Sequence, residues 1–394
     1  MCEKKLVPKL RFSGFDDEWK AVKLNKVGDI VTGATPPTKN KSNFTNSGYL
    51  WVTPGDIDSK KFVSKTERNL SEEGLKNGRK LEPYSILVTC IGATIGKICM
   101  INEVGSCNQQ LNAISPHENF YPDFIYYNIQ KTAKNLILLA GNTATPILNK
   151  KSFGNLSYNF PSFDEQKKIA LFIDKIDQKI ELLEQKYQEY QDFKKYLMQQ
   201  IFAQKLRFDK QNEWKTVEIK SVVSEYKEKA GDNEYPILSS TLSGIFLQSD
   251  YFDKNVNSSD TQDYKVVPKG FFTYRSMSDT GVFRFNIQNI VEKGIISPAY
   301  PVFTTENIND MFLEQYLNNS PYIKRQILTL KEGGTRYALG FNKFKKLKIE
   351  VPSVNEQNKI ADCFNTVDTK INHVDNELKN INNFKKGLLQ QMFV

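Results

Sequence analysis

Two short motifs contain residue types that bind nucleotides or methylate bases, and both depart from the patterns that such chemistry needs. Residues 92–98 (Gly-Ala-Thr-Ile-Gly-Lys-Ile) share features with a phosphate-binding loop, but three residues separate the glycines where the P-loop has four. The lysine is also followed by isoleucine instead of Ser or Thr. Residues 35–38 (Thr-Pro-Pro-Thr) lack the Asn or Asp and the following aromatic residue of an amino-methyltransferase active site. We therefore expect no catalytic centre in this chain.

The remaining reactive residue types point the same way. The sequence has no Ser/His/Asp set, no Gly-x-Ser-x-Gly and no glycine-rich cofactor loop. Five cysteines without a Cys-x-x-Cys, together with only two histidines, argue against a zinc site, so we expect this chain to have no metal and no cofactor of its own. No apolar run is long enough for a secretory signal or a membrane span. These features predict reduced thiols in a cytoplasmic protein.

Two small polar loops are better suited to binding than to catalysis. Residues 141–145 (Gly-Asn-Thr-Ala-Thr) follow a predicted helix over 122–139, and residues 333–337 (Gly-Gly-Thr-Arg-Tyr) follow a predicted helix over 310–328. Glycine lets the backbone approach a ligand closely, and Arg336 carries the paired donors that fit a guanine edge. An ordinary helix-to-strand turn is the alternative interpretation of both loops.

The charge of the chain is consistent with a polyanionic partner. Its net charge is +9, but residues 21–160 hold 16 Lys and Arg against 10 Asp and Glu, whereas residues 216–351 hold 17 against 16. The basic excess therefore lies mainly in the first of these segments. Lysines and arginines that neutralise phosphates release counterions, which favours binding to nucleic acid.

An internal repeat shows which elements must position these loops. Residues 161–203 align without gaps on residues 352–394, with 17 of 43 positions identical. A shorter echo pairs residues 9–20 with residues 205–215. The stretches between the repeats do not resemble each other closely. One framework therefore occurs twice, with a different domain inserted in each copy.

Each repeat has the apolar spacing of a coiled-coil helix. Apolar residues alternate at intervals of four and three, and each series is interrupted at an equivalent lysine, Lys194 or Lys385. This spacing keeps one stripe of side chains facing a partner helix. Two amphipathic helices on separate domains remain the alternative. The seam positions are Ile169, Ile173, Ile176, Ile180 and Leu183 in the first repeat and Ile360, Phe364, Val367, Ile371, Val374 and Leu378 in the second.

The reach of the chain predicts the direction of the two helices. A helix of about 40 residues is roughly 60 Å long, whereas the connection over residues 204–215 reaches at most about 40 Å. If the following domain begins and ends near one point, the second helix starts near the end of the first, and the pair is antiparallel. We expect an α+β protein with two globular α/β domains separated by two long antiparallel coiled-coil helices, in a pseudo-two-fold, circular repeat. The expected parts are residues 1–160, 161–204, 205–351 and 352–394.

These features resemble a type I restriction–modification specificity (S) subunit nearly end to end. The most specific signature is Pro-x-x-x-Glu-Gln-x-x-Ile-Ala, which opens both helical repeats at Pro161 and Pro352. The first domain has further family-like blocks at residues 51–56, 92–97 and 108–109, and the second has them at residues 235–239, 294–300 and 333–337. The two domains thus resemble different recognition subfamilies.

The resemblance implies a non-catalytic protein that binds an asymmetric, bipartite site on double-stranded DNA. Each target recognition domain would read one half-site, and the helices would set the gap between them. Two methyltransferase subunits using S-adenosylmethionine would methylate adenine, and restriction subunits using ATP and Mg would join them. Two rivals stay open: a coiled-coil scaffold whose domains bind proteins or glycans, and a catalytic subunit with a divergent methyltransferase site.

The candidate DNA-binding residues are those in the small polar loops and the aromatic and basic side chains near them. In the first domain they are Thr35, Trp51, Thr53, Lys97, Asn108, Gln109, Asn142 and Thr143. In the second domain they are Ser239, Ser240, Tyr274, Arg275, Ser276, Arg336 and Tyr337. Trp51 and Asn108 lie inside the family-like blocks, so a structural role is the alternative for both.

Overall fold

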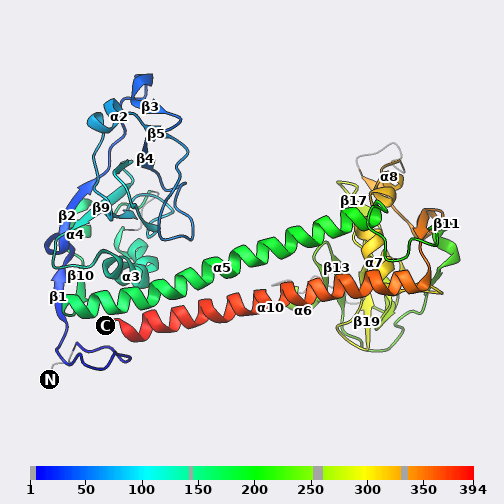
Figure 1. Ribbon diagram of the computed structural model, residues 1–394. Coiled ribbons are helices and arrows are strands. Elements are labelled where there is room, and N and C mark those ends of the chain that lie inside the picture. The colour runs from blue at the N-terminus through cyan, green and yellow to red at the C-terminus, as the bar shows by residue number, and fades with distance from the viewer. Residues whose placement is uncertain (1–5, 142–144, 252–260, 330–335) are drawn as a thin grey trace. The chain divides into compact units, whose positions relative to one another are not determined.

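The computed structural model describes residues 6–141, 145–251, 261–329 and 336–394 (Figure 1). The chain divides into two compact units, one of Met1–Glu184 with Asn376–Val394 and one of Gln185–Asp375. The two long helices, α5 (Phe163–Phe202) and α10 (Val354–Met392), each contribute one end to each unit. Each unit therefore contains one of the two dissimilar domains and its own short helical pair.

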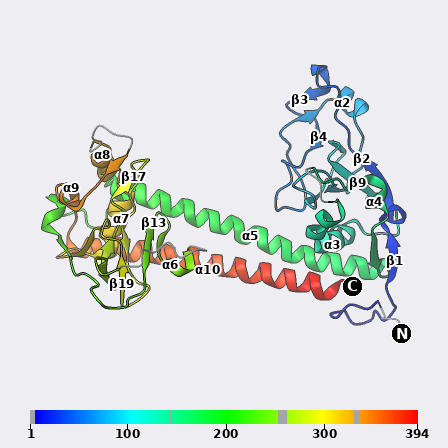
Figure 2. The same cartoon turned by 180° about the vertical axis from the view of Figure 1, so that it is seen from behind.

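The first domain is built on two four-stranded sheets (Figure 2). One has the order β2-β9-β6-β7 with antiparallel neighbours, and the other has the order β3-β5-β4-β8, in which β4 and β8 run parallel. The strands are β2 (Gly28–Thr32), β3 (Phe44–Thr45), β4 (Tyr49–Val52), β5 (Asn69–Leu70), β6 (Ile86–Thr89), β7 (Ile98–Met100), β8 (Gly105–Cys107) and β9 (Leu111–Pro116). The helices are α1 (Leu24–Val27), η1 (Lys41–Asn43), α2 (Glu72–Asn77), α3 (Pro122–Thr132), η2 (Ala133–Leu139) and α4 (Lys150–Gly154).

The second domain has different strand connections. Its four-stranded sheet has the order β12-β20-β16-β18, and the domain also contains three antiparallel pairs, β13-β14, β15-β19 and β17-β21. The strands are β12 (Val223–Glu225), β13 (Leu238–Thr241), β14 (Gly244–Leu247), β15 (Lys265–Pro268), β16 (Phe272–Thr273), β17 (Met277–Ser278), β18 (Asn286–Ile287), β19 (Lys293–Ile296), β20 (Val302–Thr305) and β21 (Tyr337–Ala338). The helices are η3 (Ile219–Ser221), α6 (Gln248–Tyr251), α7 (Asp310–Asn319), α8 (Pro321–Thr329) and α9 (Phe341–Phe344).

Both helices predicted after the sheets are shorter than expected. The predicted helix over 122–139 is α3, followed by the tighter 3-10 helix η2. The predicted helix over 310–328 is broken between α7 and α8 at Ser320, which has extended backbone angles. The physical reason is Pro321, because a proline disfavours the helical conformation in the residue before it and is itself well placed in the first turn of a new helix.

A short two-stranded ribbon connects each domain to its long helix. In the first unit β1 (Lys20–Lys23) pairs antiparallel with β10 (Ser157–Phe160), so that Lys20 lies opposite Phe160. In the second unit β11 (Lys215–Glu218) pairs with β22 (Lys348–Val351), so that Lys215 lies opposite Val351. These strands include the end of the shorter sequence echo and the residues just before each helical repeat. The framework of the repeat is therefore a ribbon followed by a helix.

The long helices run antiparallel within each unit, as the chain-reach argument predicts. In the first unit Ile169, Ile173 and Ile176 share one core with Leu388 and Met392. In the second unit Leu197 and Ile201 share one core with Ile360, Phe364 and Val367. Of the predicted seam positions, Ile371 and Leu378 are partly buried and the other nine are buried. The 4-3 apolar spacing thus marks the face that each helix buries. None of the described helices is both long and apolar enough to cross a membrane.

Candidate functional site

The glutamate of the repeated helix signature anchors the start of each long helix. Arg11 donates from Nε and Nη2 to the two carboxylate oxygens of Glu165, both at 2.8 Å. Arg207 makes the same two bonds to Glu356, also at 2.8 Å. Both glutamates are buried. Their position in the first helical turn is favourable, because the amino end of a helix carries partial positive charge.

The two glutamates differ in their remaining partners. Glu356 also accepts hydrogen bonds from the indole N–H of Trp214 and the backbone N–H of Phe208. Burial would raise the pKa of the Glu356 carboxyl, but the hydrogen bonds from Arg207 and the backbone outweigh it and hold the pKa below its usual range. In the first unit the indole nitrogen of Trp19 is buried without a hydrogen-bond partner among the described residues.

The glutamine of the signature joins the long helix to the domain. The side-chain oxygen of Gln166 accepts from the backbone N–H of Tyr121 at 3.0 Å, and its amide donates to the carbonyl of Pro161 at 3.1 Å. Gln357 accepts from the N–H of Asn309 at 2.8 Å and donates to the carbonyl of Pro352 at 3.0 Å. Tyr121 and Asn309 are the residues that precede α3 and α7. The signature therefore positions each domain on its helix.

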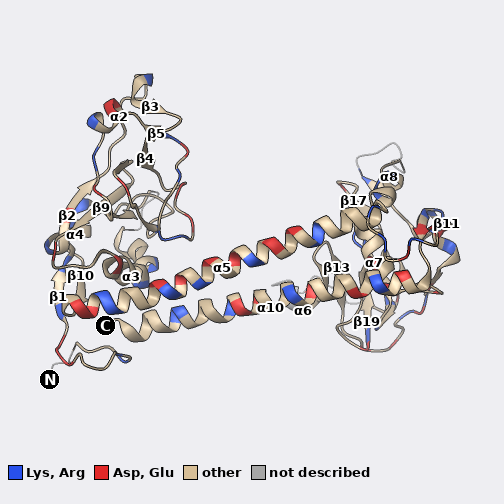
Figure 3. Cartoon of the chain, in the orientation of Figure 1, with Lys and Arg blue, Asp and Glu red and all other residues tan. Residues whose placement is uncertain are grey.

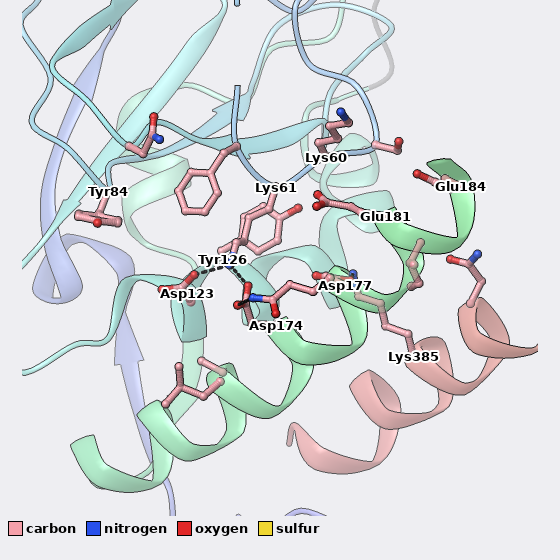
Figure 4. A pocket seen from close by; sticks show the side chains of 18 of the residues that line it. Lys60, Lys61, Tyr84, Asp123, Tyr126, Asp174, Asp177, Glu181, Glu184 and Lys385 are labelled. Carbon is pink, nitrogen blue, oxygen red and sulfur yellow. Dashed lines mark hydrogen bonds and ion pairs between the residues drawn. The ribbon is translucent and has the colours of Figure 1, made fainter. Parts of the chain in front are cut away.

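A hollow of about 470 Å³ in the first unit lies where the domain meets the helices (Figure 4). On one side of it Lys61 forms ion pairs with Asp123 of α3, at 2.6 Å, and with Asp174 of α5. Burial would lower the pKa of Lys61, but the hydrogen bonds to Asp123 and Asp174 outweigh it and raise the pKa above its usual value. Lys61 thus ties the sheet-bearing part of the domain to the helical part.

Loops at one end of the first domain hold most of its candidate residues. Exposed Thr35 donates its hydroxyl hydrogen to the side-chain oxygen of Gln109. Thr53 bonds Asp56 through its N–H at 2.8 Å and its hydroxyl at 2.7 Å. Lys97 donates to the carbonyls of Pro54 and Ile57, both at 3.0 Å. The structure therefore brings together the loops after β2, β4 and β8 and the turn between β6 and β7.

Two aromatic or amide candidates in the first domain are packing residues. Trp51 is buried in β4, and its indole N–H donates to the carbonyl of Ala34 at 3.1 Å. Asn108 is buried, and its side chain bonds both the amide N–H and the side chain of Gln110 at 3.0 Å. Both side chains hold the loops in shape from within. Asn142 and Thr143 lie outside the described residues.

A second hollow, of about 410 Å³, gathers candidates of the second domain. Ser239, Ser240 and Arg275 line it, together with Asp279 and Arg284, which the sequence reasoning did not select. The Nε atom of Arg284 is buried without a hydrogen-bond partner among the described residues, and its charge lowers the pKa of Glu314, which burial raises overall. The lining of serine, threonine and arginine side chains is suited to hydrogen bonding with base edges or phosphates.

Three candidates of the second domain have internal bonds. Tyr274 is fully buried among Phe285, Phe303 and Phe344, and its hydroxyl donates to the carbonyl of Leu339 at 2.9 Å. The hydroxyl of Ser276 donates to the carbonyl of Ala299 at 2.8 Å, and the hydroxyl of buried Ser240 accepts from Asn286 at 2.9 Å. Tyr274 is therefore a core residue in this structure.

Tyr337 begins β21, and Arg336 immediately precedes it, next to Asp279 of the hollow. Arg336 is exposed and forms an ion pair with Asp279. Tyr337 lies opposite Ser278, and its ring packs close to Gly281. The segment from Ser278 to Val282 was not predicted to contribute to the site, because its composition resembles that of an ordinary loop. The only signal in the sequence is an arginine on either side of it, Arg275 and Arg284.

Lysines and arginines occur in both domains (Figure 3), and several of them are exposed. In the first domain Lys39, Lys41, Lys76, Arg79 and Lys80 are exposed around η1 and α2. In the second domain Arg275 and Arg336 are exposed near the second hollow. Exposed cations of this kind favour an anionic ligand.

Comparison with protein families gives two matches within the chain. A family model described as the type I restriction modification DNA specificity domain matches residues 16–191 and again residues 211–383. Each match contains one domain and most of the long helix that follows it.

Curated relatives are specificity subunits of type I restriction enzymes. The EcoR124I/EcoR124II subunit of Escherichia coli is 29% identical over 203 residues, which cover 46% of this chain and 49% of the relative. The HindI subunit of Haemophilus influenzae is 30% identical over 166 residues, covering 40% of this chain and 36% of the relative. The chain thus aligns with half or less of the length of these relatives. The MjaVIII subunit of Methanocaldococcus jannaschii is 23% identical, over 95% of this chain and 91% of the relative.

Solved structures share the fold. The S subunit of a type I restriction–modification system from M. genitalium superposes with a TM-score of 0.61 and 15% identity, covering 98% of this chain and 99% of that chain. A chain from a study of complex assembly and conformational transition of the type I system has a TM-score of 0.57 and 15% identity, covering 96% and 98%. At these identities the likeness concerns the fold alone.

Proposed function

Because the chain belongs to the family of type I restriction–modification DNA specificity proteins, we propose that it is a non-catalytic subunit that recognises an asymmetric DNA site in two parts. Each domain reads one half-site through its loops, and α5 and α10 connect the two readers. The bases read in the first domain face the loops around Thr35 and Gln109. Those read in the second face the hollow lined by Ser239 and Arg275.

The observation that carries this proposal is a duplicated framework around two different domains. The Arg–Glu anchor and the glutamine contacts occur in both units with partners at equivalent positions and nearly the same distances. The strand orders and loops that the framework presents are different in the two units. A protein that recognises two unlike half-sites needs a repeated framework that carries two different DNA-binding domains.

The partners follow from the same family. We propose that two methyltransferase subunits bind this chain and supply S-adenosylmethionine chemistry on adenine, and that restriction subunits using ATP and Mg join them. Several large apolar side chains of α5 are exposed and available for contact with a partner subunit. They are Phe163, Leu171, Phe172, Leu182, Phe193 and Tyr196.

The test is to express the chain with a methyltransferase subunit of its own system in a host free of DNA methylation. Single-molecule sequencing of the host genome should then show methyladenine at one gapped, asymmetric motif. The host with the methyltransferase subunit alone is the control. A soluble complex that forms and methylates no defined motif would count against sequence recognition and favour a scaffold.

A domain exchange tests the modular part of the proposal. Replacing residues 216–351 with a domain of the same type from another specificity subunit should change one half of the methylated motif. The other half and the gap should stay the same, because the first domain and both helices are retained. A motif altered in both halves would show that the domains do not read independently.

A further inference from the structure

One acidic residue stands directly beside the arginine best suited to read a base in the second domain. A carboxylate oxygen of Asp279 lies 2.7 Å from Nε of Arg336, and both side chains are exposed, at 66% and 62%. Strands β17 and β21 run antiparallel with Ser278 opposite Tyr337. Asp279 directly follows β17 and Arg336 directly precedes β21, so the ion pair joins the two chain segments at the end of this strand pair.

The backbone that carries this pair is firmly held. The backbone N–H of Leu339, just after β21, donates to the carbonyl of Ser276 at 2.8 Å. The carbonyl of Leu339 accepts a hydrogen bond from the hydroxyl of buried Tyr274. After Asp279 the chain turns at Gly281, whose φ of +78° favours glycine. A Cβ at Gly281 would lie 3.2 Å from the ring of Tyr337. The turn is therefore packed against Tyr337, the residue that follows Arg336.

Asp279 also belongs to the second hollow. It lines that hollow with Arg275, Ser278 and Thr280. Three other lining residues, Leu242, Met277 and Val282, are exposed apolar side chains. A hollow lined by both polar and apolar side chains can contact base edges through hydrogen bonds and thymine methyl groups through apolar contact.

We propose that Asp279 is a positioning residue that aims Arg336 at a guanine of the half-site read by the second domain. This proposal rests on the proposed function. Arginine has a long, flexible side chain, and holding it before the DNA arrives reduces the entropy that binding must remove. Because the carboxylate meets Nε, the two terminal nitrogens remain to donate to O6 and N7 of guanine.

Asp279 has a second effect that a purely structural pair would not have. Its negative charge repels phosphates, so Arg336 is a weaker contact for the DNA backbone than an unpaired arginine would be. The carboxylate thus weakens the non-specific contact of Arg336 with phosphates. It leaves the specific contact between the terminal nitrogens and a base. Removing it should raise non-specific affinity while lowering discrimination.

The experiment uses the complex with the methyltransferase subunit and the motif found by genome sequencing. Asp279→Asn, Arg336→Ala and the double variant are compared in equilibrium binding to the cognate duplex and to duplexes with one G·C pair changed. Asp263→Asn is the matched control, because Asp263 is an exposed acid paired with Lys229 at 2.7 Å and lies outside the hollow. Melting temperatures of all variants report on folding.

Asp279→Asn should lower discrimination at a single G·C position about tenfold, the scale of one good arginine–guanine contact, and bind non-cognate DNA more tightly. Arg336→Ala should lose discrimination at the same position, and the double variant should be no worse than Arg336→Ala. Full discrimination in a folded Asp279→Asn complex would overturn the positioning role, as would an equal effect of Asp263→Asn. A wild-type complex without any sequence preference would overturn the proposed function, and this role with it.

Discussion

The ammonium of Lys194 on α5 lies 2.5 Å from a carboxylate oxygen of Asp368 on α10, within the second unit. In the first unit Lys385 of α10 lies 2.5 Å from Asp177 of α5. The two repeats are 191 residues apart, so Lys385 is the equivalent of Lys194 and Asp368 is the equivalent of Asp177. The same pair therefore forms twice, with the lysine on α5 in one unit and on α10 in the other. Two helices with purely apolar seams can slide to neighbouring alignments at little cost. A lysine in the seam forms its ion pair only in the alignment that places an acidic residue opposite it. The two pairs therefore specify how the helices align in each unit.

Charge exchange tests this role in register. Lys385→Glu should destabilise the protein by about 1–2 kcal/mol, because it sets two carboxylates against each other in a partly buried place. The double variant Lys385→Glu with Asp177→Lys should recover most of the loss in chemical denaturation. A double variant as unstable as the single one would show that the pair is not what aligns the helices.

A charge placed in the seam should have a larger effect. Ile176→Asp puts a carboxylate where the side chain is 7% exposed, at a cost of about 3–5 kcal/mol. Leu182→Asp is the matched control on the same helix, since Leu182 is 67% exposed and should tolerate the change within about 0.5 kcal/mol. Thermal denaturation of both variants checks the prediction, and similar melting temperatures would contradict the assignment of the buried face.

The sequence predicted the helical part of the fold because a 4-3 repeat is a local pattern. Ile169 and Ile360 could be placed on the buried stripe from spacing alone. The partner of Glu165 could not, because Arg11 lies 154 positions away in the chain and only tertiary folding brings the two together. The repeat of the signature is visible in the sequence. Its contacts with the domain, such as the hydrogen bond between Gln166 and the backbone of Tyr121, are not.

The candidate site was predicted less well, for a physical reason. Trp51 and Tyr274 were selected as aromatic side chains near the candidate loops, but aromatic rings also fill cores, and composition does not show which side chains are exposed. Arg275 and Arg336 are exposed, since a charged side chain is seldom fully buried. Charge was therefore the better guide to the surface. Asp279 was missed because its role depends on which strand lies opposite.

The Arg207–Glu356 anchor predicts a specific dependence on acid. The folded-state pKa of Glu356 lies below its usual value, so the anchor stabilises the fold above about pH 4.5 and loses this contribution as the pH falls through the folded pKa. Glu356→Gln should cost about 3 kcal/mol at neutral pH, because it leaves a largely buried guanidinium without its counter-charge.

The measurement is the free energy of unfolding of wild type and Glu356→Gln from pH 7 downwards. The difference between them should shrink on acidification as wild-type Glu356 becomes protonated. Glu292→Gln, an exposed acid of the same domain, controls for general charge effects. If the difference in the free energy of unfolding does not change with pH, Glu356 stabilises the fold through packing and neutral hydrogen bonds and not through its charge.

Lys61 should matter more than its neighbour Lys60, although both line the first hollow. Lys61→Met leaves Asp123 and Asp174 without their shared cation in a partly buried place, which should cost about 2–3 kcal/mol. Because the folded-state pKa of Lys61 is raised, its contribution is fully present below about pH 10.5 and is lost only as the pH rises above that value. Lys60→Met is the control, and equal destabilisation by the two variants would remove the bridging role.

Arg275 offers the most direct test of the second hollow as a reader of DNA. Arg275→Ala should weaken one half of the recognised motif and leave the other half unchanged, because its exposed guanidinium lines the hollow of the second domain. A base contact would appear as about 1–3 kcal/mol of lost discrimination at one position. A phosphate contact would weaken binding to all sequences and reduce the slope of log K against log salt by about one. Arg325→Ala on α8, an exposed arginine that does not line the hollow, is the matched control. An Arg275→Ala complex with unchanged affinity, salt dependence and motif would show that the half-site is read elsewhere on the domain.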